Sequence, residues 1–264
     1  MGSGSGSGSG PSRAQRPGQA GSVLAGRVSA VAPPRPHRPV TPPDWREVVG
    51  LHWRVEPDRV RSLVPRGTRP DEHDGAAWAS LVAYRFVDST VPPLPRLGRL
   101  GTMTEIVVQV ATVDELGRQG VAYRSIDTQH LPAVAAARLI GLPYVWARAG
   151  SRVRADDVAH RTERRRRGST AGGAGCLVRV TPGTEEVVPD AATRFVSDRW
   201  GVHAPSWGAT RWWRREHEPW TFRSVTVDRL DDTLLAAAGL PGLAGREPDL
   251  TTWSPGVVVR YSRG

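Results

Sequence analysis

Residues 105–113 read EIVVQVATV, and this stretch decides the fold class. Most of its residues are β-branched, and two sets of side chains alternate along it: Ile106, Val108 and Val110 on one face, and Val107, Gln109 and Ala111 on the other. β-Branched residues with a period of two are typical of strands. The stretch therefore predicts a β-strand that begins at Glu105.

Similar patterns on both sides of this run predict further strands. Residues 76–87, AAWASLVAYRFV, alternate well enough for a half-buried strand, and shorter candidates follow at 120–126, 176–180 and 257–261. The connection ELGRQG at 115–120 contains two glycines and suits a hairpin loop, because glycine readily adopts left-handed turn positions.

Helices are expected to be few and short, with candidates at 56–63, 131–140, 190–199 and 230–238. Asp190 suits the N-cap of the third, and Gly141 and Pro143 form a normal exit from the second. Many strands with a few helices predict an α+β, mainly antiparallel β domain. No Rossmann fingerprint, P-loop or internal repeat is present in the sequence.

Composition divides the chain into a tail and one folded domain. Residues 1–43 are rich in Gly, Ser and Pro and are predicted to be disordered, whether the Gly-Ser repeat is native or not. Residues 44–264 are predicted to form the domain. Within it, residues 151–175 contain RTERRRRGSTAGGAG, and this basic, glycine-rich segment is predicted to be a mobile loop.

The charge is unusual, because the 36 basic residues are all arginine and the formal net charge is +10. Such a charge favours non-specific attraction to polyanions. The single cysteine, Cys176, excludes an intrachain disulfide and any multi-cysteine metal site. No apolar stretch approaches the roughly 18 residues that span a bilayer. We therefore expect a cytoplasmic protein without a membrane, metal or cofactor partner, and leave open whether it forms a homo-oligomer.

A series of short motifs follows in a characteristic order. They are Trp45, His52-Trp53, Leu63-Val64-Pro65, Asp74-Gly75, Trp78, Glu105, Gly120-Val121, Ser125, Asp127, Ala137-Arg138, Leu142-Pro143-Tyr144, Asp198-Arg199-Trp200, His217, Pro219-Trp220 and Ser254-Pro255-Gly256. This succession resembles the YqjF-like family, a branch of the acetoacetate decarboxylase-like superfamily. The resemblance spans about residues 44–261. It implies a curved antiparallel sheet that closes into a cone-like barrel around a pocket, with short helices outside.

The resemblance also bears on the chemistry. In acetoacetate decarboxylases the corner that resembles residues 141–143 is followed by paired lysines, one of which forms a Schiff base with the keto acid. Here Tyr144 and Val145 follow, and the chain contains no lysine. Arginine stays protonated and cannot replace it. Decarboxylation through a lysine Schiff base is therefore excluded. Gln109 also stands where the YqjF-like pattern usually has an arginine, which removes a fixed cation.

The candidate pocket residues are Glu105, Gln109, Ser125, Asp127, Arg138 and Tyr144. A desolvated Glu105 would serve as a general base, or it would pair with Arg138 or Arg124. Arg138 would hold a carboxylate in a bidentate manner, or it would extend from its helix toward solvent. Tyr144 would donate its hydroxyl into the pocket, or pack as an ordinary core tyrosine.

Ser125 and Asp127 are two residues apart and so share one face of a strand. They suit a polar pocket wall, or hydrogen bonding at the strand end. The leading hypothesis is a pocket for a small carbonyl or carboxylate compound, with catalytic roles for Glu105 and Tyr144 if the protein is an enzyme. The alternative is a non-catalytic module that binds nucleic acid or protein through the arginine-rich segment 161–167.

Overall fold

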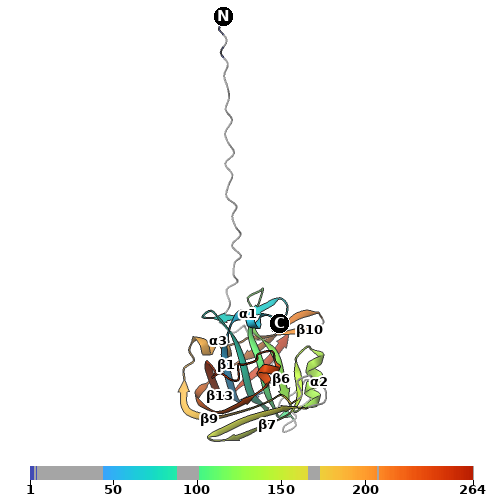
Figure 1. Ribbon diagram of the computed structural model, residues 1–264, viewed down its shortest axis with the longest axis vertical. Coiled ribbons are helices and arrows are strands. Elements are labelled where there is room, and N and C mark those ends of the chain that lie inside the picture. The colour runs from blue at the N-terminus through green and yellow to red at the C-terminus, as the bar shows by residue number, and fades with distance from the viewer. Residues whose placement is uncertain (3, 5–43, 88–100, 166–172, 207, 264) are drawn as a thin grey trace.

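The computed structural model describes residues 1, 2, 4, 44–87, 101–165, 173–206 and 208–263 (Figure 1). The predicted disordered tail, residues 1–43, therefore lies almost wholly outside the described residues. The described residues contain thirteen strands in all. They are β1 (Asp44–Val55), β2 (Thr68–Pro70), β3 (Glu72–His73), β4 (Ala76–Val87), β5 (Met103–Asp114), β6 (Gln119–Thr128), β7 (Tyr144–Arg154), β8 (Asp157–Arg164), β9 (Gly175–Val187), β10 (Gly201–Ser206), β11 (Ala209–His217), β12 (Phe222–Asp232) and β13 (Leu250–Arg263). The five predicted strands are present, within β4, β5, β6, β9 and β13.

Four short helices accompany these strands within the described residues. They are α1 (Pro57–Arg61), α2 (Leu131–Leu139), α3 (Ala191–Ser197) and α4 (Leu234–Ala237). Each lies within one of the four predicted segments. The fourth is much shorter than predicted, because residues 230–232 continue β12 and pair with residues 176–178 of β9. Asp190 caps α3 as predicted, since its carboxylate accepts the Thr193 N–H at 2.7 Å.

The stretch that opened the sequence analysis forms the middle of β5, between β4 and β6. Val107, for example, is opposite Val82 on one side and Ile126 on the other, in antiparallel register. The hairpin to β6 is confirmed, and Gly117 supplies the left-handed residue with φ +74°. Strands β6 and β7 pair in parallel, and α2 provides the crossover that parallel neighbours require.

The sheet closes on itself. Nine strands form the ring, in the order β6, β7, β8, β9, β12, β13, β1, β4 and β5, and a β5–β6 pairing completes it. Strands β10 and β11 form a second connection, because β10 pairs with β6 and β11 pairs with β13. This mainly antiparallel, closed sheet confirms the predicted fold class. Closure pairs strands that would otherwise be edges of the sheet.

Strands β1, β4 and β5 separate two apolar regions because side chains alternate between their faces. On the face toward the ring interior lies the larger core, which includes Leu51, Trp53 and Ile106, all 0% exposed. On the opposite face a smaller cluster contains Trp45 and Tyr84. The polar groups of the candidate site lie on this second face, so the ring interior is filled and the site is beside it.

The predicted mobile loop at residues 151–175 is wrong for most of its length. Residues 151–154 belong to β7, residues 157–164 form β8, and β9 begins at residue 175. Residues 166–172 lie outside the described part of the chain. The strand pattern was missed because the segment contains many arginines. Every second side chain of β8 points inward and is buried: Val158, His160, Thr162 and Arg164.

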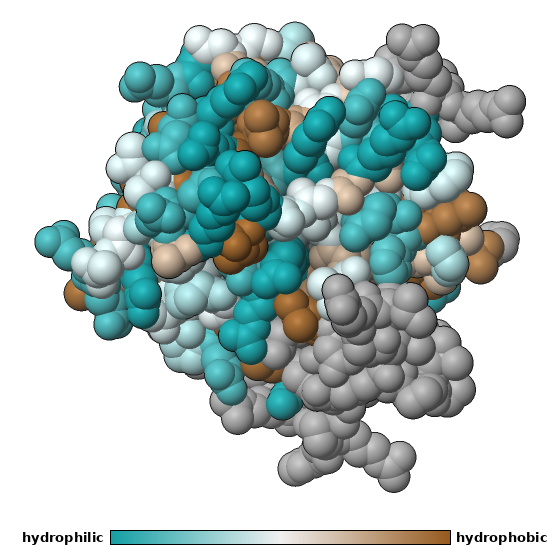
Figure 2. Space-filling model, turned by 90° about the horizontal axis from the view of Figure 1, so that it is seen from below, coloured by the Kyte–Doolittle hydropathy of each residue, from teal (hydrophilic) through white to brown (hydrophobic). Residues whose placement is uncertain are grey.

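The outward residues of β7, β8 and β9 form a polar face. Viewed from the end of the molecule where β7 and β9 lie, hydrophilic side chains cover much of the surface (Figure 2). Its arginines have acidic neighbours: Asp157 binds Arg152 at 2.8 Å and Arg179 at 2.7 Å. The positive charge of this face is therefore partly neutralised. This weakens the hypothesis that the described residues of the face bind a polyanion.

None of the helices in the described residues has the length and apolar character needed to cross a bilayer. Cys176 is a buried, free thiol at the start of β9. Burial raises the pKa of this thiol well above its usual value, so it stays protonated and behaves as a small core residue.

Candidate functional site

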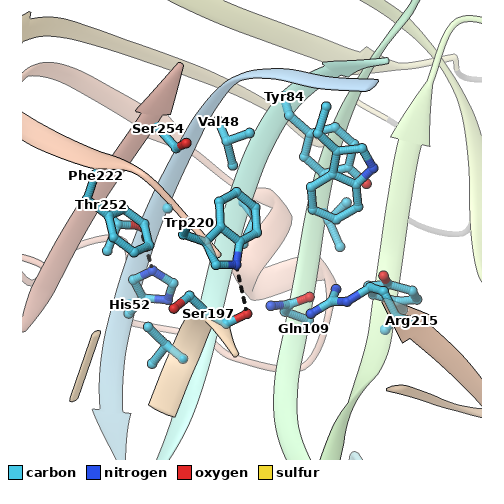
Figure 3. Close-up of a pocket in the computed structure, with 16 residues that line it drawn as sticks. Val48, His52, Tyr84, Gln109, Ser197, Arg215, Trp220, Phe222, Thr252 and Ser254 are labelled. Atoms are coloured by element: carbon cyan, nitrogen blue, oxygen red, sulfur yellow. Dashed lines mark hydrogen bonds between the residues drawn. The ribbon is translucent and has the colours of Figure 1, made fainter. Parts of the chain in front are cut away.

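A cavity of about 40 Å³ lies against the second face of β1, β4 and β5 (Figure 3). That volume accommodates a few water molecules or a small ligand group. Residues from seven strands, from α3 and from the segment before β12 enclose it. Its lining residues are Trp45, Val48, Gly50, His52, Val82, Tyr84, Val107, Gln109, Tyr123, Val196, Ser197, Arg215, Trp220, Phe222, Thr252 and Ser254.

His52 forms one wall of the cavity and is fixed at both ring nitrogens. Its Nδ1 lies 2.8 Å from Ser80 Oγ, and its Nε2 lies 3.2 Å from Thr252 Oγ1. Burial lowers the pKa of His52 to about 3, so the imidazole is neutral at physiological pH. Gly50 is required beside it, because a Cβ there would lie 2.4 Å from Thr252 Oγ1 and 2.5 Å from His52 Nε2.

Arg215 of β11 brings a buried cation to the cavity, with 4% of the residue exposed. Its Nε donates to the carbonyl of Arg199 at 2.9 Å, and its guanidinium carbon lies 5.7 Å from the centre of the Trp45 ring. Within the described residues no carboxylate forms an ion pair with it. Burial lowers the pKa of Arg215, but Tyr123 and other tyrosines outweigh this effect and leave its pKa raised.

Gln109 faces Arg215 across the cavity, and in Figure 3 the amide and the guanidinium point toward one another. Gln109 is buried on β5, with 7% exposed. Strand β11 thus brings a cation to the cavity that Gln109 of β5 also lines. Among the described residues that line the cavity, Arg215 is the only charged side chain at neutral pH.

Glu105 lies at the start of the same face of β5 and is 0% exposed. The hydroxyl of Tyr84 donates to Glu105 Oε2 at 2.7 Å. Among the described residues, Oε1 has no hydrogen-bond partner of normal geometry, although Tyr144 lies close to this carboxyl group. Burial raises the pKa of Glu105 to about 7, and the hydroxyls of Tyr84 and Tyr144 offset only part of this rise.

The chain's four tyrosines come together around this carboxyl group. Tyr84, Tyr144 and Tyr261 interact electrostatically with Glu105, and Tyr123 lies beside each of the three. Burial raises the pKa of Tyr84 and Tyr144 well above the usual value, so these phenols stay neutral. Tyr84 belongs to both groups of residues, because it also lines the cavity.

The six residues predicted from the sequence are divided by the structure. Glu105, Gln109 and Tyr144 share one face, with Gln109 in the cavity wall and Tyr144 beside Glu105. Ser125 and Asp127 face away from it, and both are buried. Asp127 binds Arg164 through two hydrogen bonds, of 2.7 and 3.0 Å.

Arg138 is exposed on α2, and its Nε donates to the backbone carbonyl of Tyr144 at 2.7 Å. It therefore holds the chain at Tyr144 and does not line the cavity. The alternative prediction, a salt bridge from Glu105 to Arg138 or Arg124, is wrong. Arg124 donates instead to the carbonyls of Leu63 at 2.8 Å and Ala238 at 3.3 Å.

Sequence reasoning missed Arg215 and Tyr84. Tyr84 could have been found, because it pairs with Glu105 in the β4–β5 register and both strands were predicted. Arg215 carries no local signal, since it is one of several arginines in a strand that joins the sheet through β10 and β13. The arginine-rich segment 161–167 does not form a basic loop in its described part, because Arg164 is buried and Arg165 stacks 4.2 Å from the centre of the Trp146 ring.

A larger cavity of about 370 Å³ adjoins the first. Ser197, Trp220 and Phe222 line both cavities, so the Trp220 indole stands between them. Its Nε1 donates to the Ser197 carbonyl at 3.2 Å (Figure 3). His217 lines the outer cavity and stacks on Trp200 with ring centres 4.4 Å apart.

Neither cavity offers an evident metal site. Within the described residues, no three His, Cys, Asp or Glu side chains lie together in a way that could hold a metal ion. The donors around the inner cavity are instead hydroxyls, an amide and a guanidinium. Such groups bind oxygen-rich organic ligands through hydrogen bonds.

Comparisons with known proteins agree with this fold. The chain is 24% identical over 197 residues to the uncharacterized protein YqjF of Bacillus subtilis (strain 168), which is 74% of this chain and 80% of that protein. The acetoacetate decarboxylase of Legionella pneumophila has a similar structure, with a TM-score of 0.55, 16% identity, and coverage of 90% of this chain and 93% of that one.

An acetoacetate decarboxylase-like enzyme from Sphingomonas wittichii RW1 is similar at a TM-score of 0.53 and 14% identity, over 84% of this chain and 91% of that one. At these identities the structural likeness establishes the fold alone. The model of the family DUF2071, described as an uncharacterized conserved protein, matches residues 43–258. The chain therefore belongs to the DUF2071 family, with an acetoacetate decarboxylase-like fold.

Proposed function

We propose that the inner cavity binds a small organic acid, a carbonyl or hydroxy compound that carries a carboxylate, and that Arg215 holds the carboxylate. The observation that carries this proposal is a buried cation that faces an apolar cavity without a carboxylate partner in the described residues. An uncompensated buried charge is costly. A ligand carboxylate would offset that cost through charge-assisted hydrogen bonds.

The other polar groups of the cavity suit the rest of such a ligand. The Gln109 amide both donates and accepts hydrogen bonds, so it can bind a carbonyl or a hydroxyl oxygen. His52 is neutral and held by Ser80 and Thr252, so it adds a polar wall without adding charge. The aromatic rings of Trp45, Trp220 and Phe222 would contact the apolar part of the ligand.

The small size of the inner cavity limits the ligand to a short chain. The outer cavity, at about 370 Å³, would serve as the entrance, with Trp220 between the two. If the protein turns the ligand over, the chemistry is acid–base chemistry of Glu105 and Tyr144 rather than imine formation, since lysine is absent. The absence of lysine also separates this protein from the Schiff-base decarboxylases whose fold it shares.

The test is a binding screen of short keto and hydroxy acids, each with its neutral amide as a control. The wild-type protein should bind at least one of the acids, with a rise in Tm and heat in calorimetry, and should not bind its amide. Arg215→Met keeps much of the side-chain length and removes the charge. We expect it to weaken acid binding about 10- to 100-fold, the loss of one or two charge-assisted hydrogen bonds.

The matched control is Arg229→Met, which removes an exposed arginine of β12 whose side chain is 61% accessible. It should leave the affinity within about twofold of wild type. Equal affinity of the Arg215→Met and wild-type proteins would overturn the proposal, provided that both variants keep the wild-type circular dichroism. Binding of the amides as tightly as the acids would overturn it as well.

A further inference from the structure

Glu105 is a buried carboxyl group without a cation. It is 0% exposed, and within the described residues no arginine or histidine forms an ion pair with it. Groups from five strands face it or its tyrosine neighbours: Tyr84 of β4, Tyr123 of β6, Tyr144 of β7, Arg215 of β11 and Tyr261 of β13. The nearest groups are therefore neutral phenols. They donate hydrogen bonds but cannot neutralise a negative charge.

One of these phenols connects the carboxyl group to the cavity. The Tyr84 hydroxyl donates to Glu105 Oε2 at 2.7 Å, and the Tyr84 side chain also lines the cavity next to Arg215 and Tyr123. Glu105 itself does not line the cavity. The Tyr84 side chain thus lies between the cavity and the Glu105 carboxyl group. A neutral phenol screens this carboxyl group only weakly from a charge inside the cavity.

We propose that the cavity takes up its carboxylate ligand together with one proton, which Glu105 holds and receives through the Tyr84 hydroxyl. This inference rests on the proposed function and adds a proton as a second bound species. The proton balance is simple: the buffer acid gives up one proton, and water in the cavity relays it to Tyr84 Oη as the proton of Tyr84 passes to Glu105 Oε2, so that the water is left neutral. Only O–H bonds form and break, and no redox partner is needed.

The reason is a count of charges. Arg215 supplies one positive charge, and a ligand carboxylate neutralises it. An ionised Glu105 would then be a second, uncompensated negative charge in a water-poor site, where repulsion between like charges is strong. Protonating Glu105 removes that repulsion. Burial already raises the pKa of Glu105 to about 7, so the carboxyl group can gain a proton near neutral pH.

Calorimetry measures this proton directly. The acid identified by the binding screen is titrated into the protein at pH 7.5 in two buffers of different ionisation enthalpy. The difference in heat should correspond to net uptake of a substantial fraction of one proton. Affinity should fall as the pH rises above about 7, approaching about a tenfold loss per pH unit, as one-proton linkage requires.

Glu105→Gln keeps the size and hydrogen bonding of the side chain and cannot ionise. It should bind the acid without proton uptake, with an affinity nearly independent of pH from 6.5 to 8.5. Tyr84→Phe removes the donor that stabilises the carboxylate, so the pH at which affinity begins to fall should shift upward. Glu163→Gln, a carboxylate of β8 with 47% of its side chain accessible, is the control and should keep the wild-type pH dependence.

An infrared measurement gives a readout that does not depend on the binding affinity. Ligand addition to the wild-type protein at pH 8 should increase the carboxylic-acid C=O band, and Glu105→Gln should lack this change. Acid binding without proton uptake, or an unchanged pH dependence in Glu105→Gln, would overturn this inference and leave the proposed function standing. Failure of wild type to bind any of the acids would remove both.

Discussion

At the scale of single residues, buried charges in this protein have three different kinds of surroundings. Asp127 has a two-point partner in Arg164, Arg215 faces a cavity, and Glu105 is surrounded by phenols. The sequence predicted Glu105, Gln109 and Asp127 as candidate pocket residues. It did not predict their partners, since Arg164, Arg215 and Tyr84 come from other strands.

The Asp127–Arg164 pair lends itself to a stability prediction. Both side chains are nearly inaccessible, at 0% and 5%, so removing one partner leaves a buried, unpaired charge. Asp127→Asn should therefore lower the free energy of unfolding by about 3–5 kcal/mol. Urea unfolding monitored by tryptophan fluorescence measures it.

The double variant Asp127→Leu, Arg164→Met removes both charges together. It should lose clearly less stability than Asp127→Asn, because no isolated charge remains. If the double variant were as unstable as the single one, the unpaired charge would not be the cause. Packing of the two side chains would then explain the loss.

At the scale of elements, local signals predicted most of what formed. The 76–87 pattern matches β4 from end to end, and the 105–113 pattern extends by two residues to Met103 and by one to Asp114. Two local predictions were wrong because strand pairing outweighed the charge of one segment and the helix propensity of the other. Residues 157–164 form a strand despite their arginines, and residues 230–232 stay in β12 because β9 supplies a hydrogen-bonded partner.

The N-cap of helix α3 can be tested by mutation. This helix also contributes Val196 and Ser197 to the cavity wall. Asp190→Ala removes the side chain that accepts the Thr193 N–H and should cost about 1 kcal/mol of stability. Asp190→Asn, which can still cap, should cost much less. Equal losses in the two variants on thermal unfolding would argue against the cap as the cause.

The same cap predicts a pH effect with a definite sign. The hydrogen bonds from Thr193 lower the pKa of Asp190 below its ordinary value of 3.8. A lowered carboxyl pKa means that the stabilisation is present above about pH 4 and is lost as the pH falls through the folded-state pKa. The stability difference between wild type and Asp190→Ala should therefore shrink at low pH.

At the scale of the whole molecule, closure of the sheet depends on pairings between distant parts of the sequence. Strand β13 pairs with β1, β11 and β12, and periodicity in a single sequence does not identify such partners. The succession of motifs supplied the fold class through family resemblance. The position of the cavity could not be predicted in that way, because it depends on which face of β1, β4 and β5 the strand β11 covers.

This closed architecture buries several histidines in neutral form. Burial lowers the pKa of His52 to about 3 and the pKa of His160, His203 and His217 to about 4, from an ordinary value of 6.5. For His160, a 2.7 Å contact between Nδ1 and Ser151 Oγ and a 2.8 Å contact between Nε2 and the Glu47 carbonyl show why both ring nitrogens are fixed.

These four histidines predict steep acid unfolding. Between about pH 6.5 and 4 the unfolded chain binds protons that the folded chain does not, so stability falls as the pH is lowered. Glu105, whose pKa burial raises to about 7, acts in the opposite direction by less than one proton. For these five groups together the difference near pH 5 is on the order of three protons, or about 4 kcal/mol per pH unit. Burial also raises the pKa of Asp127, Asp198 and Asp232, which reduces this difference. Urea unfolding at a series of pH values from 4.5 to 7 measures this slope. His160→Gln should reduce it by about one proton, and an unchanged slope in this variant would mean that His160 is not buried in neutral form.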